Sequence, residues 1–200
     1  MPRIIAGRAG GTVLSAPPSG TRPTSDRVRE SLFAALESGD ALDGARVADL
    51  YAGTGSLALE ALSRGAASAD LVEHAPAAER LARANAARVQ KAMAGALSTT
   101  AVRVHRQPVS AFVAAAHGPF DLVFLDPPYD LGDGELARVL TALEASLAPG
   151  ALVVIERAAR SAEPEVPGPW KPERHKRYGD TAIWWYRAPD EPQPRAESQS

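Results

Sequence analysis

One candidate for chemistry is the tetrapeptide Asp126-Pro127-Pro128-Tyr129, which directly follows the apolar run 120–125. An aspartate before a proline is held in an extended backbone conformation. The two prolines fix their own φ angles and donate no backbone hydrogen bond, so nearby carbonyls become rigid acceptors. A carboxylate and such a carbonyl can bind both hydrogens of an exocyclic amine, while Tyr129 can stack on the ring that bears it. This arrangement would direct the lone pair of the amine at a methyl donor.

A second candidate is the glycine-containing sequence ADLYAGTGSLALEALSRG at residues 48–65. Gly53 and Gly55 allow a tight turn and a close approach of a ligand to the backbone, before a helix whose first N–H groups are free. The spacing fits a dinucleotide fingerprint imperfectly, because Ala58 stands where the third glycine would be. Asp49 would also repel a diphosphate. An acid there suits a cationic group instead, such as the amino group of S-adenosylmethionine (SAM).

Glu73 follows Gly55 at the end of the next apolar run, 69–73. An acid at that place commonly accepts hydrogen bonds from ribose hydroxyls. An ordinary surface glutamate would look the same in the sequence, so Glu73 is evidence for a ribose site only together with the glycine turn. The combination favours a cofactor that contains a nucleoside.

The elements that must position these residues alternate in type. Apolar runs predict strands at 46–50, 69–73, 101–105, 120–125 and 151–156. Helical periodicity predicts helices at 56–65, 77–93, 109–116 and 134–148, the last ended by Pro149-Gly150. This alternation is typical of an α/β fold with a largely parallel sheet and helices on both faces. Ligands bind at the carboxyl ends of such strands, where Asp49 and Asp126 lie.

Further elements are predicted on either side of this core. Residues 3–16 read as two short apolar stretches around glycines, which indicates a β-hairpin. A helix is expected over 23–38, with Thr24 or Ser25 as its N-cap. A late hairpin is expected around Gly179-Asp180, which brings the sheet to seven strands.

The predicted domains are an N-terminal extension at 1–40, a catalytic domain at 41–187 and a disordered tail at 188–200.

Composition narrows the classes of function. The chain has 200 residues, a net charge of −2 and no cysteine, so disulfides and thiolate metal sites are excluded. Its four histidines lack metal-ligand spacing, and no apolar run approaches a membrane span. We therefore expect a cytoplasmic protein without metal, and a monomer. Arginines gather in residues 1–29 and basic residues in 164–187, which together could form one basic face around a nucleic-acid site.

Four segments carry a resemblance to a known family: TRPTSDRVRESLF (21–33), DLYAGTGSLALEALSRGA (49–66), FDLVFLDPPY (120–129) and KRYGDTA (176–182). Over residues 3–187 the chain resembles the class I SAM-dependent methyltransferases, and among them the bacterial RsmD-type enzymes. These methylate the N2 atom of a guanine in 16S ribosomal RNA. The resemblance implies a Rossmann-like fold, SAM as cofactor, and 16S rRNA in the 30S subunit or an assembly intermediate as partner.

The resemblance also implies roles for single residues. Asp126 and the Pro127 carbonyl would bind the guanine amine, with Tyr129 stacked on the base. SAM would be held by Asp49, Tyr51, Gly53, Thr54, Gly55, Glu73, Val109 and Asp126. RNA would be contacted by Arg22, Thr24, Ser25, Arg29, Lys176, Arg177 and Tyr178.

One departure and three alternatives stay open at this point. Pro108 stands where relatives carry an acid close to the adenine of SAM, so adenine recognition is expected from the backbone or from Val109. Adenine-N6 methylation of DNA uses the same Asp-Pro-Pro-Tyr logic, although 200 residues leave no room for an added target-recognition domain. A non-catalytic assembly factor that binds SAM and RNA is a second alternative, and a dehydrogenase is a distant third.

Overall fold

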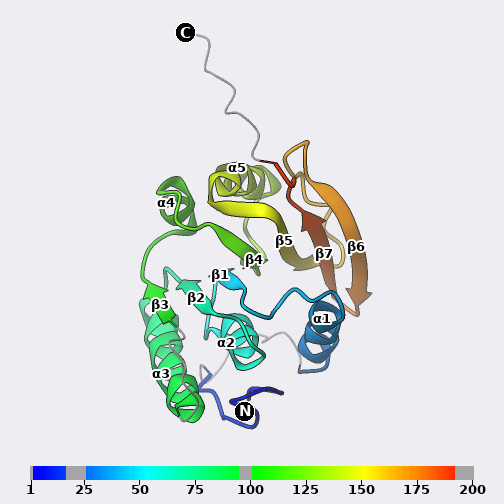
Figure 1. Cartoon of the computed structure of the whole chain (residues 1–200). Helices are drawn as coiled ribbons and strands as arrows, with labels where there is room; N and C mark the ends of the chain where they lie inside the picture. Colours follow the sequence, from blue (N-terminus) through cyan, green and yellow to red (C-terminus); the bar gives the residue numbers. More distant parts are fainter. Residues whose placement is uncertain (1, 17–25, 95–100, 192–200) are drawn as a thin grey trace.

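The computed structural model describes residues 2–16, 26–94 and 101–191 (Figure 1). Seven strands form one sheet in the order β3-β2-β1-β4-β5-β7-β6. The strands are β1 (Arg46–Leu50), β2 (Ser68–Val72), β3 (Ala101–His105), β4 (Phe120–Leu125), β5 (Leu147–Ala158), β6 (Lys171–Tyr178) and β7 (Thr181–Arg187). β1 to β5 pair in parallel, and β7 runs antiparallel to both of its neighbours. The predicted seven-stranded, mostly parallel sheet is confirmed.

The helices cover the sheet on both sides, as Figure 1 shows. They are α1 (Asp26–Ser38), α2 (Ser56–Ser63), α3 (Pro76–Met93), α4 (Val109–Ala114) and α5 (Asp133–Leu143). α1, α2 and α3 lie against one face, and α4 and α5 lie against the other. The expected Rossmann-like layering is confirmed.

Each central strand is buried on both faces, because its side chains alternate between two hydrophobic clusters. In β4, Phe124 packs with the cluster under α1 to α3, whereas Val123 and Leu125 pack with the cluster under α4 and α5. All three side chains are almost fully buried. This double burial explains why the strand reads as a continuous apolar run in the sequence.

The predicted end of the last core helix is wrong. α5 stops at Leu143, a short 3-10 turn follows at Glu144–Ser146, and β5 already begins at Leu147. Pro149 and Gly150 therefore lie within β5 rather than terminating a helix. The sheet tolerates them because the pairing of β4 with β5 shifts register here, and because the Gly150 amide bonds instead to the Pro189 carbonyl.

The N-terminal hairpin is reduced to a single β-bridge between Arg3 and Val13. The backbone amides of Ile5 and Ala6 instead donate to the carboxylate of Glu60 on α2, at 2.7 and 3.0 Å. We call residues 2–16 the N-terminal segment. Its two halves are also joined by backbone hydrogen bonds, from the Ile4 amide to the Thr12 carbonyl and from the Leu14 amide to the Pro2 carbonyl, each at 2.9 Å.

Candidate active site

The candidate site forms where β1 and β4 end side by side. Leu50 pairs with Leu125, and the Asp126 amide donates to the Leu50 carbonyl at 3.4 Å. This pairing brings the glycine turn after β1 next to the Asp-Pro-Pro-Tyr loop after β4. The two strongest sequence candidates therefore meet at one edge of the sheet, as the parallel topology predicts.

The turn after β1 has a backbone that excludes most side chains. Gly53 and Gly55 have φ angles of 56° and 79°, in the left-handed region that favours glycine. A Cβ atom on Gly55 would lie 2.4 Å from the Leu71 side chain, whereas a Cβ on Gly53 would meet nothing within 4 Å. Gly55 is thus required by packing, and Gly53 leaves an open side from which a ligand can approach the backbone.

Asp49 lies beneath this turn and is 1% exposed. One of its carboxylate oxygens accepts a hydrogen bond of 3.1 Å from the Ala58 amide in the first turn of α2. Burial raises the pKa of Asp49 to about 7, with a smaller contribution from Glu73, while the Ala58 hydrogen bond opposes the rise. A cation bound here would lower this pKa again, so Asp49 is suited to a positively charged ligand group.

Glu73 is fixed by two backbone donors. One of its carboxylate oxygens accepts from the Gly53 amide at 2.9 Å, and the other accepts from the Ala75 amide at 2.7 Å. A carboxylate oxygen has capacity for more than one hydrogen bond. Glu73 therefore shapes the turn and still offers acceptors at the edge of the site, where ribose hydroxyls were expected.

Asp126 is the half-buried acid at the end of β4. Burial, followed by the nearby carboxylates of Glu156 and Asp49, holds its pKa well above the ordinary value. Glu156 lies on the neighbouring strand, one residue beyond Ile155, which pairs with Leu125. Glu156 was not among the residues predicted for the site. The signal for it is present in the sequence, because it follows an apolar strand in the same way as Asp126.

The loop after Asp126 presents an exposed ring. Pro127 is buried, whereas Tyr129 is 68% exposed. The Leu131 amide donates to the Pro128 carbonyl at 3.0 Å, and the Arg157 guanidinium donates to the Leu131 carbonyl and to Asp133. The loop is therefore closed by an internal turn and anchored at its far end, while the exposed tyrosine ring is accessible for stacking on a planar ligand.

Tyr51 and Val109 reach the site differently from the acids. Tyr51 has a φ of 68°, a strained value for a residue with a side chain, and burial raises its pKa to about 12. Val109 begins α4 directly after Pro108, and its side chain is buried in the cluster under α4 and α5. The buried side chain leaves the backbone as the part of Val109 that could contact a ligand.

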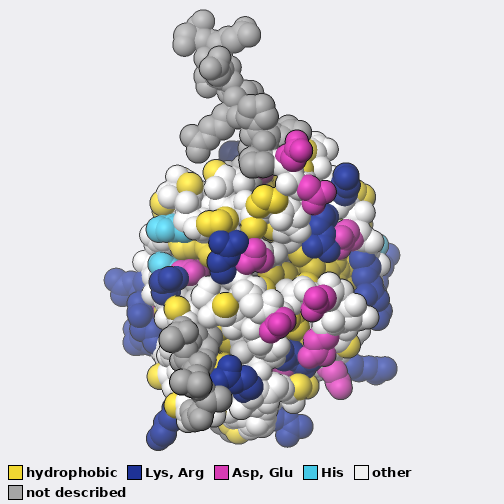
Figure 2. Space-filling model, in the orientation of Figure 1, with side chains coloured by type: hydrophobic (Ala, Val, Ile, Leu, Met, Phe, Trp, Pro, Cys, Tyr) yellow, Lys and Arg dark blue, Asp and Glu magenta, His cyan; other side chains and the backbone are white. Residues whose placement is uncertain are grey.

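A basic cluster lies at the same edge of the sheet, on β6. This strand runs in the same direction as β5, so Lys176 and Tyr178 lie near its carboxyl end. Ser31 of α1 receives a hydrogen bond from the Lys176 ammonium at 3.1 Å and bonds to the Tyr178 hydroxyl at 2.8 Å. Figure 2 shows Lys and Arg side chains gathered over β6, which also carries the exposed Arg177. Ser31 has no sequence signal beyond its position in the helix.

Arg29 differs from the expectation of a surface residue. It is 1% exposed, and its guanidinium donates to the Arg3 carbonyl at 2.6 Å and to Asp26 at 2.9 Å. Burial lowers its pKa. These contacts make Arg29 a link between α1 and the N-terminal segment. Three other residues predicted at the RNA surface lie outside the described residues: Arg22, Thr24 and Ser25.

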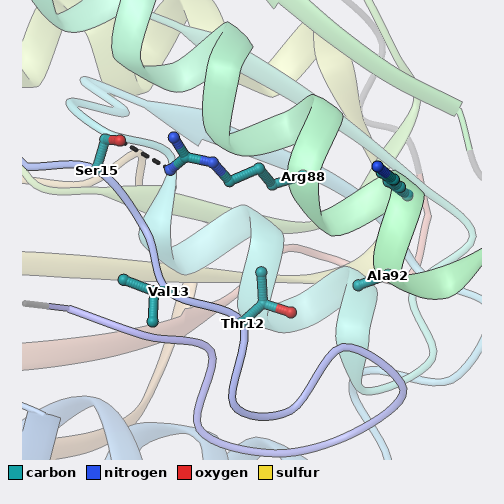
Figure 3. Close-up of a pocket in the computed structure, with 6 residues that line it drawn as sticks. Thr12, Val13, Ser15, Arg88 and Ala92 are labelled. Atoms are coloured by element: carbon teal, nitrogen blue, oxygen red, sulfur yellow. Dashed lines mark hydrogen bonds between the residues drawn. The ribbon is translucent and has the colours of Figure 1, made fainter.

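Two hollows on the surface are separate from this edge. One of about 630 Å³ lies between the N-terminal segment and the last turns of α3 (Figure 3). Another, of about 380 Å³, lies near Asp121 and Gly150, close to the start of β4 and the early part of β5. Neither is lined by a predicted site residue. Within the described ranges, no three His, Cys, Asp or Glu residues are grouped to hold a metal, and no helix is long and apolar enough to cross a membrane.

Comparison with known proteins gives consistent matches over nearly the whole chain. Residues 2–187 match the family model described as Conserved hypothetical protein 95. The Ribosomal RNA small subunit methyltransferase D of Escherichia coli is 36% identical over 188 residues, which cover 92% of this chain and 89% of that protein. The protein of the same name from Haemophilus influenzae is 34% identical over 77% of each chain.

Solved structures agree with these matches. The Escherichia coli protein yhhF superposes with a TM-score of 0.80 and 34% identity, over 94% of this chain and 98% of that one. The Thermus thermophilus protein TTHA0928 gives a TM-score of 0.74 and 30% identity, over 92% and 98% of the two chains. The predicted class I methyltransferase fold is confirmed.

Proposed function

The chain belongs to the family described as Conserved hypothetical protein 95 and is a methyltransferase, and from this premise we propose that it methylates the N2 atom of a guanine in 16S rRNA with SAM as the methyl donor. The membership confirms the resemblance to RsmD-type enzymes. The observation that carries the proposal is the meeting of the buried Asp49, under an open glycine turn, with Asp126 and the exposed Tyr129 at one edge of the sheet.

The residues around the turn fit SAM. Asp49 has a buried carboxyl whose pKa of about 7 would fall on contact with the ammonium of the methionine part. Glu73 is held by the amides of Gly53 and Ala75 in a position to accept from ribose hydroxyls. Gly53 presents open backbone between them. When bound, SAM supplies an electrophilic methyl group on a sulfonium.

The Asp-Pro-Pro-Tyr loop would orient the nucleophile. The Asp126 carboxylate and the Pro127 carbonyl accept the two hydrogens of the guanine amine, and Tyr129 stacks on the base. These contacts draw the nitrogen lone pair out of conjugation and aim it at the methyl group. In this arrangement the N–CH₃ bond would form as the S–CH₃ bond of SAM breaks, which would leave a neutral thioether and a positively charged nitrogen.

That nitrogen must then lose one proton. Asp126 accepts one of its hydrogens, and its pKa is raised by burial and by Glu156 and Asp49. A carboxylate with a raised pKa is a better proton acceptor than an ordinary one. We therefore assign Asp126 both roles, as hydrogen-bond acceptor during methyl transfer and as proton acceptor after it.

The RNA would have to present the guanine outside a stacked helix, because its N2 atom is inaccessible within one. The basic β6 ends at the same edge of the sheet, beyond β5 and β7, and would contact phosphates of the RNA that surrounds the target. The substrate would be the 30S subunit or an assembly intermediate, and we propose that the enzyme acts as a monomer in the cytoplasm.

The test is methyl transfer from labelled SAM to three acceptors: unmodified 30S particles, free 16S rRNA and duplex DNA. Label in the ribosomal acceptors alone supports the proposal and shows which assembly state is recognised. Label in DNA would contradict it in favour of adenine-N6 methylation. Binding of SAM and RNA without any transfer would instead identify a non-catalytic assembly factor.

A further inference from the structure

Asn85, in the middle of α3, is a polar residue with 0% exposure, and both polar atoms of its side chain are hydrogen-bonded. The Oδ1 atom accepts from the Ser15 amide at 2.8 Å. The Nδ2 atom donates to the Ser15 carbonyl and to the Thr54 carbonyl, each at 3.0 Å. Because unpaired buried polar atoms are costly, a buried amide with all of these bonds made specifies one arrangement of its partners.

The two partners of Asn85 belong to different parts of the molecule. Thr54 lies in the glycine turn, between Gly53 and Gly55, and Ser15 lies at the end of the N-terminal segment. Arg88, one turn further along α3, donates to the Ser15 hydroxyl at 2.8 Å, as Figure 3 shows. The N-terminal segment is thus fastened to α3 directly behind the turn that is proposed to bind SAM.

The hydrogen bond to Thr54 helps to fix the orientation of the peptide group between Thr54 and Gly55. The Thr54 carbonyl accepts from Asn85, and the amide of the same peptide group, that of Gly55, donates to the Ala52 carbonyl at 2.7 Å. A peptide group is planar, so holding it at both ends fixes its orientation. This orientation sets the direction of the neighbouring backbone at Gly53, whose open side the proposed function assigns to SAM.

We propose that Asn85 is a positioning residue that holds the SAM-binding turn in shape and couples SAM binding to the packing of the N-terminal segment. The proposal rests on the proposed function, since it assigns SAM to the turn. Coupling between two sites is reciprocal, so loosening Ser15 lowers SAM affinity and bound SAM tightens Ser15. Asn85 touches neither Asp126 nor Tyr129, so the effect falls on SAM binding rather than on turnover.

The test compares SAM affinity and steady-state kinetics in matched variants. Asn85→Asp keeps the acceptor for the Ser15 amide but turns a carboxylate oxygen toward two carbonyls. Ser15→Pro removes the backbone N–H that donates to Asn85. Ser15→Ala keeps that N–H and loses only the hydroxyl that accepts from Arg88. We expect Asn85→Asp and Ser15→Pro to weaken SAM binding. The KM for SAM should rise about tenfold, with kcat little changed at saturating SAM. Ser15→Ala should stay near wild type.

A control separates this role from a general loss of stability. Val89 is fully buried one turn along α3, so Val89→Ala should destabilise the protein without changing the KM for SAM. Hydrogen exchange at the Ser15 amide gives a second readout: SAM should slow it in the wild type and not in Asn85→Ala. If Asn85→Asp does not fold, the Ser15→Pro and Ser15→Ala pair still decides the question.

The outcomes keep the two proposals apart. SAM affinities of Asn85→Asp and Ser15→Pro within twofold of the wild type would overturn the coupling and leave the proposed function intact. SAM binding that depends on Asn85, without methyl transfer to any ribosomal acceptor, would overturn the proposed function and leave the coupling. A wild-type protein that does not bind SAM would overturn both.

Discussion

The Ala58 amide donates a 3.1 Å hydrogen bond to the buried carboxyl of Asp49, joining the end of β1 to the first turn of α2. This bond only partly offsets the cost of burying the acid, so the pKa of Asp49 remains near 7. Asp49 is therefore kept at the expense of stability. A buried acid of this kind is common where a ligand charge completes the site.

Asp49→Asn should weaken SAM binding and stabilise the free protein at alkaline pH. The folded-state pKa lies above the ordinary 3.8, so the contribution of Asp49 to stability is full below pH 3.8 and is lost as the pH rises through about 7. The variant should be more stable than the wild type at pH 8 but not at pH 4. Its affinity for SAM should fall about tenfold or more with the loss of a charge-assisted bond.

Urea unfolding at both pH values and calorimetric titration with SAM check this prediction. Glu144→Gln, a change at an exposed acid of the 3-10 turn, serves as the control and should alter neither property. Equal stability of Asp49→Asn and wild type at pH 8 would contradict the account of Asp49.

Asp126→Ala should abolish most turnover, by about 100-fold or more, since it removes a preorganised acceptor at the reacting nitrogen. Asp126→Asn keeps an acceptor oxygen but cannot take up the proton, so it should lose less. The raised pKa also predicts that kcat/KM of the wild type increases with pH as Asp126 ionises, and that this increase is absent in Asp126→Asn. Single-turnover rates across a pH series measure both effects. Retention of most activity in Asp126→Ala would contradict the mechanism.

Tyr129→Ala should raise the KM for RNA about tenfold, because stacking on a base contributes roughly 1–3 kcal/mol. Tyr129→Phe keeps the ring and should remain close to wild type. Since Tyr129 is 68% exposed, neither change should lower the melting temperature noticeably. Steady-state kinetics on 30S particles, with thermal unfolding alongside, distinguish these outcomes. An equal loss in both variants would show that the hydroxyl, rather than stacking, matters.

Lys176→Met should weaken RNA binding and reduce its dependence on salt by about one counterion, if the ammonium held by Ser31 contacts a phosphate. Ser31→Ala should produce a smaller loss, because the lysine keeps its charge but not its position. Lys171 lies at the other end of β6 and provides a matched control. Filter binding over a series of salt concentrations measures the slope. An effect of Lys171→Met as large as that of Lys176→Met would show a diffuse rather than a localised contact.

The sequence predicted the fold well where burial is strong and local chemistry is distinct. The apolar run at 120–125 coincides with β4, and Gly179-Asp180 does connect β6 to β7. Prediction failed at Pro149-Gly150, because a register shift in the sheet admits residues that usually end an element. It also failed to foresee the burial of Arg29, since the Arg3 carbonyl, which accepts a hydrogen bond from its guanidinium, is brought close only by the tertiary fold.

The candidate site divides in the same way. Asp49, Gly55 and Asp126 could be proposed from the sequence because strand ends and backbone geometry leave a trace in the residue type, and the pairing of β1 with β4 brings them to one edge of the sheet. Asn85 leaves no such trace in the sequence, since its proposed role depends on contacts with Ser15 and Thr54, two residues that are distant from it in the chain. Candidate residues whose position follows from local geometry can be proposed from a sequence, whereas residues that hold others in place through distant contacts need the structure.

The most direct test of the central claim is the identity of the methylated nucleoside. Unmodified 30S particles would be incubated with the enzyme and SAM, and the 16S rRNA would be digested to nucleosides. The nucleosides would then be separated and identified by mass spectrometry. The account predicts N2-methylguanosine, formed by the wild type and lost with Asp126→Ala. Methyl label on N6 of adenine, or on any guanine atom other than N2, would contradict it.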